Sequence, residues 1–202
     1  MKKITTLLTL FVVLINLNCE SQIIVNLDSN NGSSLSGHYY KDTFELLDPY
    51  VGTWVYVSGA TTFRIKIVKK INYYSSSLNC NYDILFGEYE YIESGVPIIN
   101  TLSLINDINI NPSEHNLRGR TVLDYYDTPI CSLCNINIPR VRMFFTDPER
   151  KYLNTFSYIG IKDGEPNKMV FFFKTTGSYM VPFDDSPGNL RVPEGKYILT
   201  KE

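Results

Sequence analysis

Few side chains in this 202-residue sequence could build a catalytic centre. Only two histidines are present, His38 and His115. His115 lies in the stretch NPSEHN, where we expect a solvated loop residue rather than a general base. The sequence contains no nucleophile elbow, zinc-protease helix or phosphate-binding glycine loop. We therefore expect no catalytic residues and no enzymatic activity.

Two glutamates at alternate positions, Glu88 and Glu90, could act as paired carboxylates in glycoside hydrolysis. A simpler interpretation places both side chains on the solvent-facing side of one strand, because apolar residues alternate with them. We favour this second interpretation.

Cys131 and Cys134 form a C-x-x-C pair. Such a pair could be a redox dithiol, half of a zinc site completed by Cys80 and His115, or a structural disulfide. The flanking residues predict a loop that enters a strand, whereas a redox pair normally begins a helix. We expect a loop-closing disulfide or two thiols in a turn, with no metal and no cofactor.

Charge and composition narrow the classes of protein further. Lys and Arg total 19 against 21 Asp and Glu, and this formal net charge of −2 excludes a typical nucleic-acid binder. The sequence contains 15 Tyr and 11 Phe but one Ala, Ala60, and one Gln, Gln22. Because aromatic residues favour strands while Ala and Gln favour helices, the composition predicts an all-β fold.

The N-terminus has the pattern of an export signal. Lys2 and Lys3 precede an apolar run that ends at Ile15, so residues 1–21 are expected to be a signal peptide. Cleavage after Ser21 and lipidation of Cys19 are both open, and we expect a membrane contact only if Cys19 is lipidated. The protein is expected to be periplasmic, attached to the outer envelope or secreted. Residues 22–37 end in polar residues and predict a flexible tether.

The remaining residues, 38–202, are expected to form a single domain. A short helical turn is predicted within residues 40–50, because Pro49 stops the helical spacing of apolar residues. Alternating polarity and intervening turn residues predict about nine strands, at 53–58, 61–71, 83–93, 98–104, 117–125, 140–146, 152–161, 168–175 and 196–201. Short connections favour an antiparallel meander, and closing it into a barrel of 8–9 strands would bury its apolar face and its edges. A two-sheet sandwich is the alternative.

The stretch from Pro49 to Val55 (PYVGTWV) resembles the opening of lipocalins and fatty-acid-binding proteins. The resemblance implies a calycin-type β-barrel in which Gly52 permits a bend and Trp54 plugs one end. It also implies a cationic partner for Trp54, for which Arg191, Lys196 and Lys201 are candidates. The stretch from Asp147 to Tyr152 (DPERKY) resembles one in small exported bacterial proteins of unknown function.

The side chains expected to face the barrel interior define the predicted site. They would line a cavity for a small hydrophobic molecule, as in a lipocalin-like carrier, or fill a packed core. In the second case the protein would be a non-enzymatic envelope scaffold or interaction module, with exposed tyrosines such as Tyr73, Tyr74, Tyr125 and Tyr126 contacting a partner. The candidate ligand-binding residues are Trp54, Tyr56, Phe63, Ile65, Ile67, Leu85, Tyr89, Tyr91, Met143 and Phe145.

Overall fold

The computed structural model describes residues 22–29, 34–178, 183 and 185–202. The described residues form strands and short 3-10 turns, with no α-helix among them, so the all-β prediction is confirmed. No helix in this part of the chain is long and apolar enough to cross a bilayer. The strands are β1 (Ile23–Asn26), β2 (His38–Lys41), β3 (Gly52–Ser58), β4 (Thr61–Ser75), β5 (Cys80–Glu93), β6 (Val96–Asn100), β7 (Leu117–Leu123), β8 (Arg140–Phe145), β9 (Leu153–Lys162), β10 (Glu165–Ser178) and β11 (Gly195–Lys201). The 3-10 turns are η1 (Leu27–Ser29), η2 (Asp48–Tyr50) and η3 (Leu102–Asn106).

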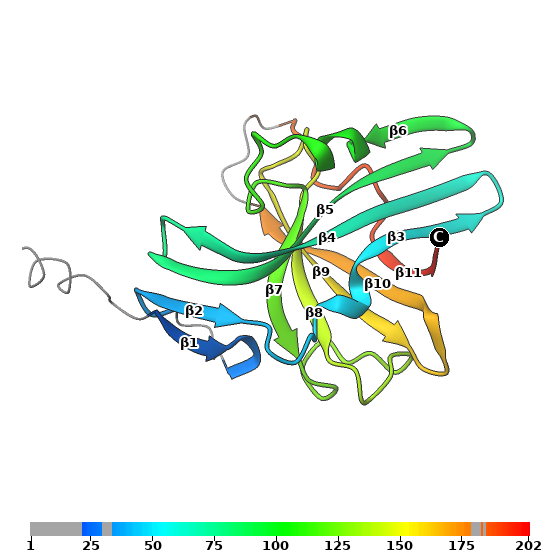
Figure 1. Cartoon of the computed structure of the whole chain (residues 1–202). Coiled ribbons are helices and arrows are strands. Elements are labelled where there is room, and N and C mark those ends of the chain that lie inside the picture. Colours follow the sequence, from blue (N-terminus) through cyan, green and yellow to red (C-terminus); the bar gives the residue numbers. More distant parts are fainter. Residues whose placement is uncertain (1–21, 30–33, 179–182, 184) are drawn as a thin grey trace, which may run out of the picture.

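Eight of these strands close into an antiparallel barrel (Figure 1). Their order is β5-β4-β3-β11-β10-β9-β8-β7, and β7 pairs back onto β5 through Leu85 and Gly119, Phe86 and Arg118, and Gly87 and Leu117. The predicted barrel is therefore confirmed, and the structure is not a two-sheet sandwich. The strand predicted at 98–104 corresponds to β6, which ends at Asn100, pairs with β5 and does not form part of the ring of eight strands. Residues 102–104 belong to η3 instead.

The closing strand depends on a glycine. A Cβ atom added to Gly119 would lie 2.5 Å from the Arg142 carbonyl oxygen and 2.6 Å from the Met143 Cα. A register shift between Arg118 and Thr121 marks a bulge at the same place. Only glycine allows β7 and β8 to approach this closely, so Gly119 helps to complete the ring of strands.

The N-terminal segment differs from the flexible tether predicted for residues 22–37. Its residues 23–26 form β1, which runs parallel to β2, and β2 in turn pairs in parallel with β5. Leu27 in η1 is buried. The polar residues that suggested a tether follow this apolar patch, in which Val25 and Leu27 pack against the core while Ile23 and Ile24 stay exposed. The predicted signal peptide, residues 1–21, lies outside the described residues.

The short helical turn predicted ahead of the first barrel strand is confirmed as η2. It carries Pro49 near its start and leads through Val51 into β3. Figure 1 shows the short turn that leads directly into β3, the strand that carries the buried Trp54.

Candidate functional site

Trp54 lies near the start of β3, directly after η2. Its side chain is fully buried, and its Nε1 donates a hydrogen bond of 2.9 Å to the carbonyl oxygen of Tyr50 in η2. The Lys201 Nζ lies 5.1 Å from the centroid of the Trp54 ring, a cation–π contact. Trp54 and Lys201 are cross-strand partners in the β3–β11 pair. Of the three candidate cations, the structure places Lys201 on the indole.

The barrel interior is crowded with aromatic rings. Phe63 lies at the centre, with its ring centroid 5.1 Å from Tyr197, 5.6 Å from Phe171 and 6.0 Å from Tyr89. Phe145 stacks on Tyr89 at 4.8 Å and on Phe173 at 4.5 Å. These separations are those of rings in direct contact.

All ten predicted ligand-binding residues lie in this interior. Nine are buried in the core, and Tyr56 is partly buried against it. Two of the ten also line cavities that open to the outside, Met143 in one and Phe145 in another. The other eight contribute to none of the three cavities described below.

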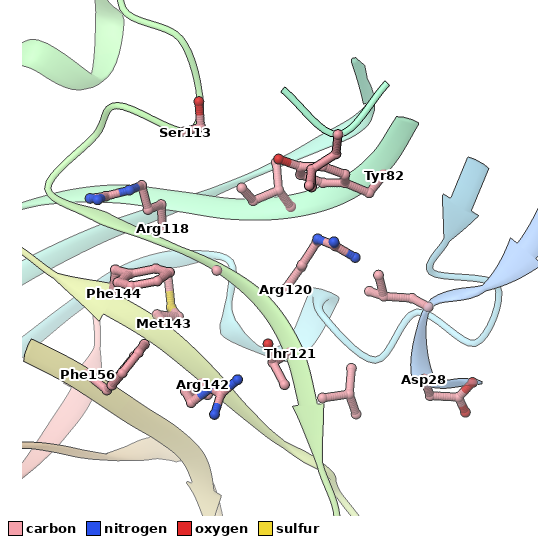
Figure 2. Close-up of a pocket in the computed structure, with 15 residues that line it drawn as sticks. Asp28, Tyr82, Ser113, Arg118, Arg120, Thr121, Arg142, Met143, Phe144 and Phe156 are labelled. Atoms are coloured by element: carbon pink, nitrogen blue, oxygen red, sulfur yellow. The ribbon is translucent and has the colours of Figure 1, made fainter. Parts of the chain in front are cut away.

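The largest of these three cavities lies against the outer side of the barrel (Figure 2). We call it the outer groove; its volume is about 530 Å³. In Figure 2, Phe144 and Phe156 lie on one side, Tyr82 and Asp28 on the other, and Arg120 lies between them. Its lining residues are Leu27, Asp28, Leu78, Tyr82, Ile84, Ser113, Arg118, Gly119, Arg120, Thr121, Val122, Arg142, Met143, Phe144 and Phe156.

Strand register brings the charged and aromatic residues of the outer groove together. Arg118 on β7 pairs with Phe144 on β8, which pairs with Phe156 on β9. Cross-strand partners point to the same face, so their side chains stand side by side outside the barrel. The Phe144 and Phe156 ring centroids are 4.8 Å apart.

Each arginine of the outer groove contacts an aromatic ring. The Arg118 guanidinium carbon lies 5.1 Å from the Phe144 centroid, and that of Arg142 lies 5.2 Å from the Phe156 centroid. Arg120 lies over Tyr82 at 4.2 Å and donates a hydrogen bond of 2.8 Å to Ser34 Oγ. The rings hold the guanidinium planes while the edges of those planes carry the N–H donors.

A second cavity of about 440 Å³ adjoins the outer groove. The two share Ser113, Arg118 and Phe144 as lining residues. Lys151 and Asn154 add polar groups to the second cavity. The two cavities therefore meet around Arg118.

His115 and Glu88 differ from their predicted solvated positions. Both are buried, and His115 Nδ1 lies 2.8 Å from Glu88 Oε1. Asn116 Nδ2 donates a hydrogen bond of 2.7 Å to Glu88 Oε2, and the His115 ring packs on Phe86 at 4.6 Å. The segment between β6 and β7 crosses the outer face of β5, so a strand face that looks solvent-exposed in the sequence is covered. A histidine and an acid do meet, but neither lines any of the three cavities.

The C-x-x-C pair is a disulfide between Cys131 and Cys134, and Cys80 is a buried free thiol. No group of three or more potential metal ligands occurs among the described residues. The disulfide lines a third cavity, of about 220 Å³, beside Arg140. The buried Arg140 donates hydrogen bonds to the carbonyl oxygens of Asp124 at 2.8 Å and Asp127 at 2.6 Å, which anchors the loop between β7 and β8.

The tyrosines named as a partner-binding patch fall into two separate pairs. Tyr125 and Tyr126 contact each other in the loop after β7. Tyr73 on β4 is partly buried, and its hydroxyl lies 2.8 Å from Ser113 Oγ. No ring contact joins the two pairs among the residues described.

Sequence reasoning missed the outer groove. Its signal was present as Arg118 and Arg120 in one strand and Arg142 and Phe144 in another, at alternate positions and without acidic residues between them. Which strands become neighbours cannot be read from that alternation, and neither can the side of the barrel that the N-terminal segment covers.

Comparison with known proteins gives a family but no activity. No curated protein and no solved structure gives a significant match to the chain. One family model matches residues 1–202, the whole sequence. The chain belongs to that family, which is described as a family of unknown function (DUF6705).

Proposed function

We propose that the protein is an exported, non-enzymatic binding protein with a calycin-like barrel, and that it holds its ligand in the outer groove rather than inside the barrel. The barrel serves as a rigid scaffold for that surface. The observation that carries this proposal is the contrast between an interior crowded with touching rings and an open groove of about 530 Å³ outside it. Ligand sites in proteins have volumes of about 300–1,000 Å³.

An interior carrier would have to displace the rings around Phe63. Those rings contact one another at 5.1–6.5 Å, so a ligand inside would separate several aromatic pairs. Each such pair contributes about 0.5–1.5 kcal/mol beyond the area that it buries. This cost favours binding outside the barrel.

The outer groove lacks the groups that usually carry out covalent or acid–base chemistry. Among the described residues that line it there is no histidine and no cysteine, and Asp28 is the one carboxylate. The buried His115 and Glu88 have hydrogen-bond partners of their own. These features support binding without catalysis.

Titration with a neutral lipophilic dye, N-phenylnaphthylamine, tests whether the ligand site is inside or outside. With an outer site and a filled interior, we expect any saturable binding of the dye to depend on the outer groove. Phe144→Ser, checked for folding by circular dichroism, removes an exposed ring of the groove and should abolish that binding. Saturable binding of the dye that persists unchanged in Phe144→Ser would overturn the proposal in favour of an interior carrier.

A further inference from the structure

The structure also indicates what kind of molecule would fit the outer groove. We infer that the groove binds a soluble organic anion, in which a carboxylate, sulfonate or phosphate group is attached to a flat aromatic body. This inference rests on the proposed function and adds the chemical class of the ligand.

Charge in the outer groove favours an anion. The guanidinium groups of Arg120 and Arg142 line the groove. None of the ion pairs between described residues involves Arg120 or Arg142. By contrast, Arg64 and Arg191, which lie elsewhere in the protein, both pair with carboxylates. The positive charges of Arg120 and Arg142 are therefore not balanced by an ion pair with another described residue.

The arginines are also oriented before a ligand arrives. Arg120 is held between Tyr82 and Tyr40, at 4.2 and 5.7 Å from their centroids, and Arg142 lies on Phe156. A guanidinium held flat by a ring still presents a fork of N–H donors that matches the geometry of an oxyanion. Because less side-chain freedom is lost on binding, this arrangement strengthens anion binding.

The aromatic side of the groove suits the remainder of the ligand. Phe144 is 40% exposed although it stands on a barrel strand, and its ring lies beside that of Phe156. Met143, Ile84 and Val122 extend the apolar lining. A paired aromatic surface bordered by guanidinium groups binds flat, negatively charged molecules through stacking and charge together.

A bounded cavity favours a small molecule over a membrane surface. The groove has a second wall, formed by Tyr82 on β5 and by Leu27 and Asp28 in η1 (Figure 2). A lipid bilayer would contact one open face, whereas this space encloses its occupant from two sides. We therefore assign it to a free molecule of the size of a fused ring system.

The test compares two dyes with the same carbon skeleton. Anilinonaphthalene sulfonate carries a sulfonate, and N-phenylnaphthylamine is the same skeleton without it. With full-length protein, we expect the sulfonate dye to bind saturably with one site and the neutral dye to bind at least 10-fold more weakly, because a favourable contact with a guanidinium contributes about a factor of ten or more.

Variants locate the site. Arg142→Gln and Arg120→Gln are each expected to weaken binding of the sulfonate dye about 10-fold, while Arg142→Lys retains part of the affinity. Arg64→Gln is the matched control, because it removes the same charge from an outward-facing position on another barrel strand. It should leave binding unchanged. Thermal unfolding of each variant confirms that it is folded.

Three results would overturn the inference. In the first, both dyes bind the groove equally, and binding is lost in Phe144→Ser but unaffected by the arginine variants. This result would show that the ligand needs no anionic group, while leaving an outer site in place. No binding of either dye would reject the ligand class. Saturable binding of the neutral dye that persists unchanged in Phe144→Ser would overturn both this inference and the proposed function.

Discussion

The ammonium group of Lys201 lies 5.1 Å from the centre of the Trp54 indole, close to the point at which η2 leads into β3. Its aliphatic chain passes directly over Gly52, where an added Cβ would lie only 2.9 Å from Lys201 Cε. Gly52 has a φ of +133°, a conformation that L-residues with side chains rarely adopt. The three residues form one structural unit, and two predictions concern it.

Gly52→Ala is expected to lower the free energy of unfolding by about 1–3 kcal/mol, because the backbone conformation is strained for alanine and the new methyl group displaces Lys201. Urea denaturation measures the loss. Gly188→Ala is the control, since nothing lies within 4 Å of its added Cβ. Equal losses in the two variants would contradict the role given to Gly52.

Lys201→Met should remove the cation–π contact and cost about 0.5–1 kcal/mol, with a change in the emission of Trp54, the sole tryptophan. Lys196→Met is the matched control from the same strand, because no contact of Lys196 with Trp54 is seen. If Lys196→Met changed the emission and Lys201→Met did not, the assignment of the cationic partner would be wrong.

Asp147 joins the turn after β8 to the segment before β11. Arg191 Nη2 donates a hydrogen bond of 2.6 Å to Asp147 Oδ1, and Asp147 is buried. Burial alone would raise the pKa of Asp147, but the hydrogen bonds from Arg191 outweigh burial and hold the pKa below its ordinary value. Asp147 opens the DPERKY stretch, so this stretch contains a structural ion pair.

A carboxylate with a lowered pKa in the folded state stabilises the protein above the unfolded-state pKa of about 4. This stabilisation is lost as the pH falls through the folded-state pKa. Asp147→Asn is therefore expected to cost about 2–3 kcal/mol at neutral pH and to reduce the acid sensitivity of unfolding. Glu149→Gln, which removes the more exposed partner of the same arginine, should cost less than about 1 kcal/mol. Unchanged acid sensitivity in Asp147→Asn would contradict this account.

The contact between His115 and Glu88 predicts a strong coupling in stability. His115→Ala and Glu88→Ala should each cost about 2–4 kcal/mol, because each leaves a buried polar group without its partner. The double variant should lose less than the sum of the two, by about 0.5–3 kcal/mol. Additive losses in urea denaturation would show that the two side chains do not interact.

Glu90→Gln provides the comparison for that cycle. In the sequence Glu90 resembles Glu88, but in the structure it forms a partly exposed ion pair of 2.8 Å with Arg64. We expect a loss of less than about 1 kcal/mol. A loss as large as that in Glu88→Ala would mean that the burial of Glu88 has no special effect.

The alternating polarity of the sequence was sufficient to predict nine strands, because a strand with one buried face must place apolar residues at every second position. The helical spacing of apolar residues ahead of Pro49 predicted a short turn within residues 40–50, which the structure contains at Asp48–Tyr50. The aromatic composition favoured strands over helices for the same reason: rings pack well on a pleated surface.

Alternation cannot predict what covers the outer face of a strand. Glu88 and His115 look solvated in the sequence, and only the path of the β6–β7 segment across β5 buries them. The predicted tether contains β1, whose pairing with β2 is a tertiary contact.

The sequence by itself therefore determined the class of fold and the approximate positions of the barrel strands, since these depend on local spacing. The tertiary structure decided which outward-facing residues meet. Two of the three arginines, Arg118 and Arg120, lie on β7, and Arg142 lies on β8 beyond a long loop. Only the pairing of β7 with β8, and of β8 with β9, gathers them beside Phe144 and Phe156. Barrel closure and strand register are long-range properties, so the candidate binding site became visible only in the folded chain.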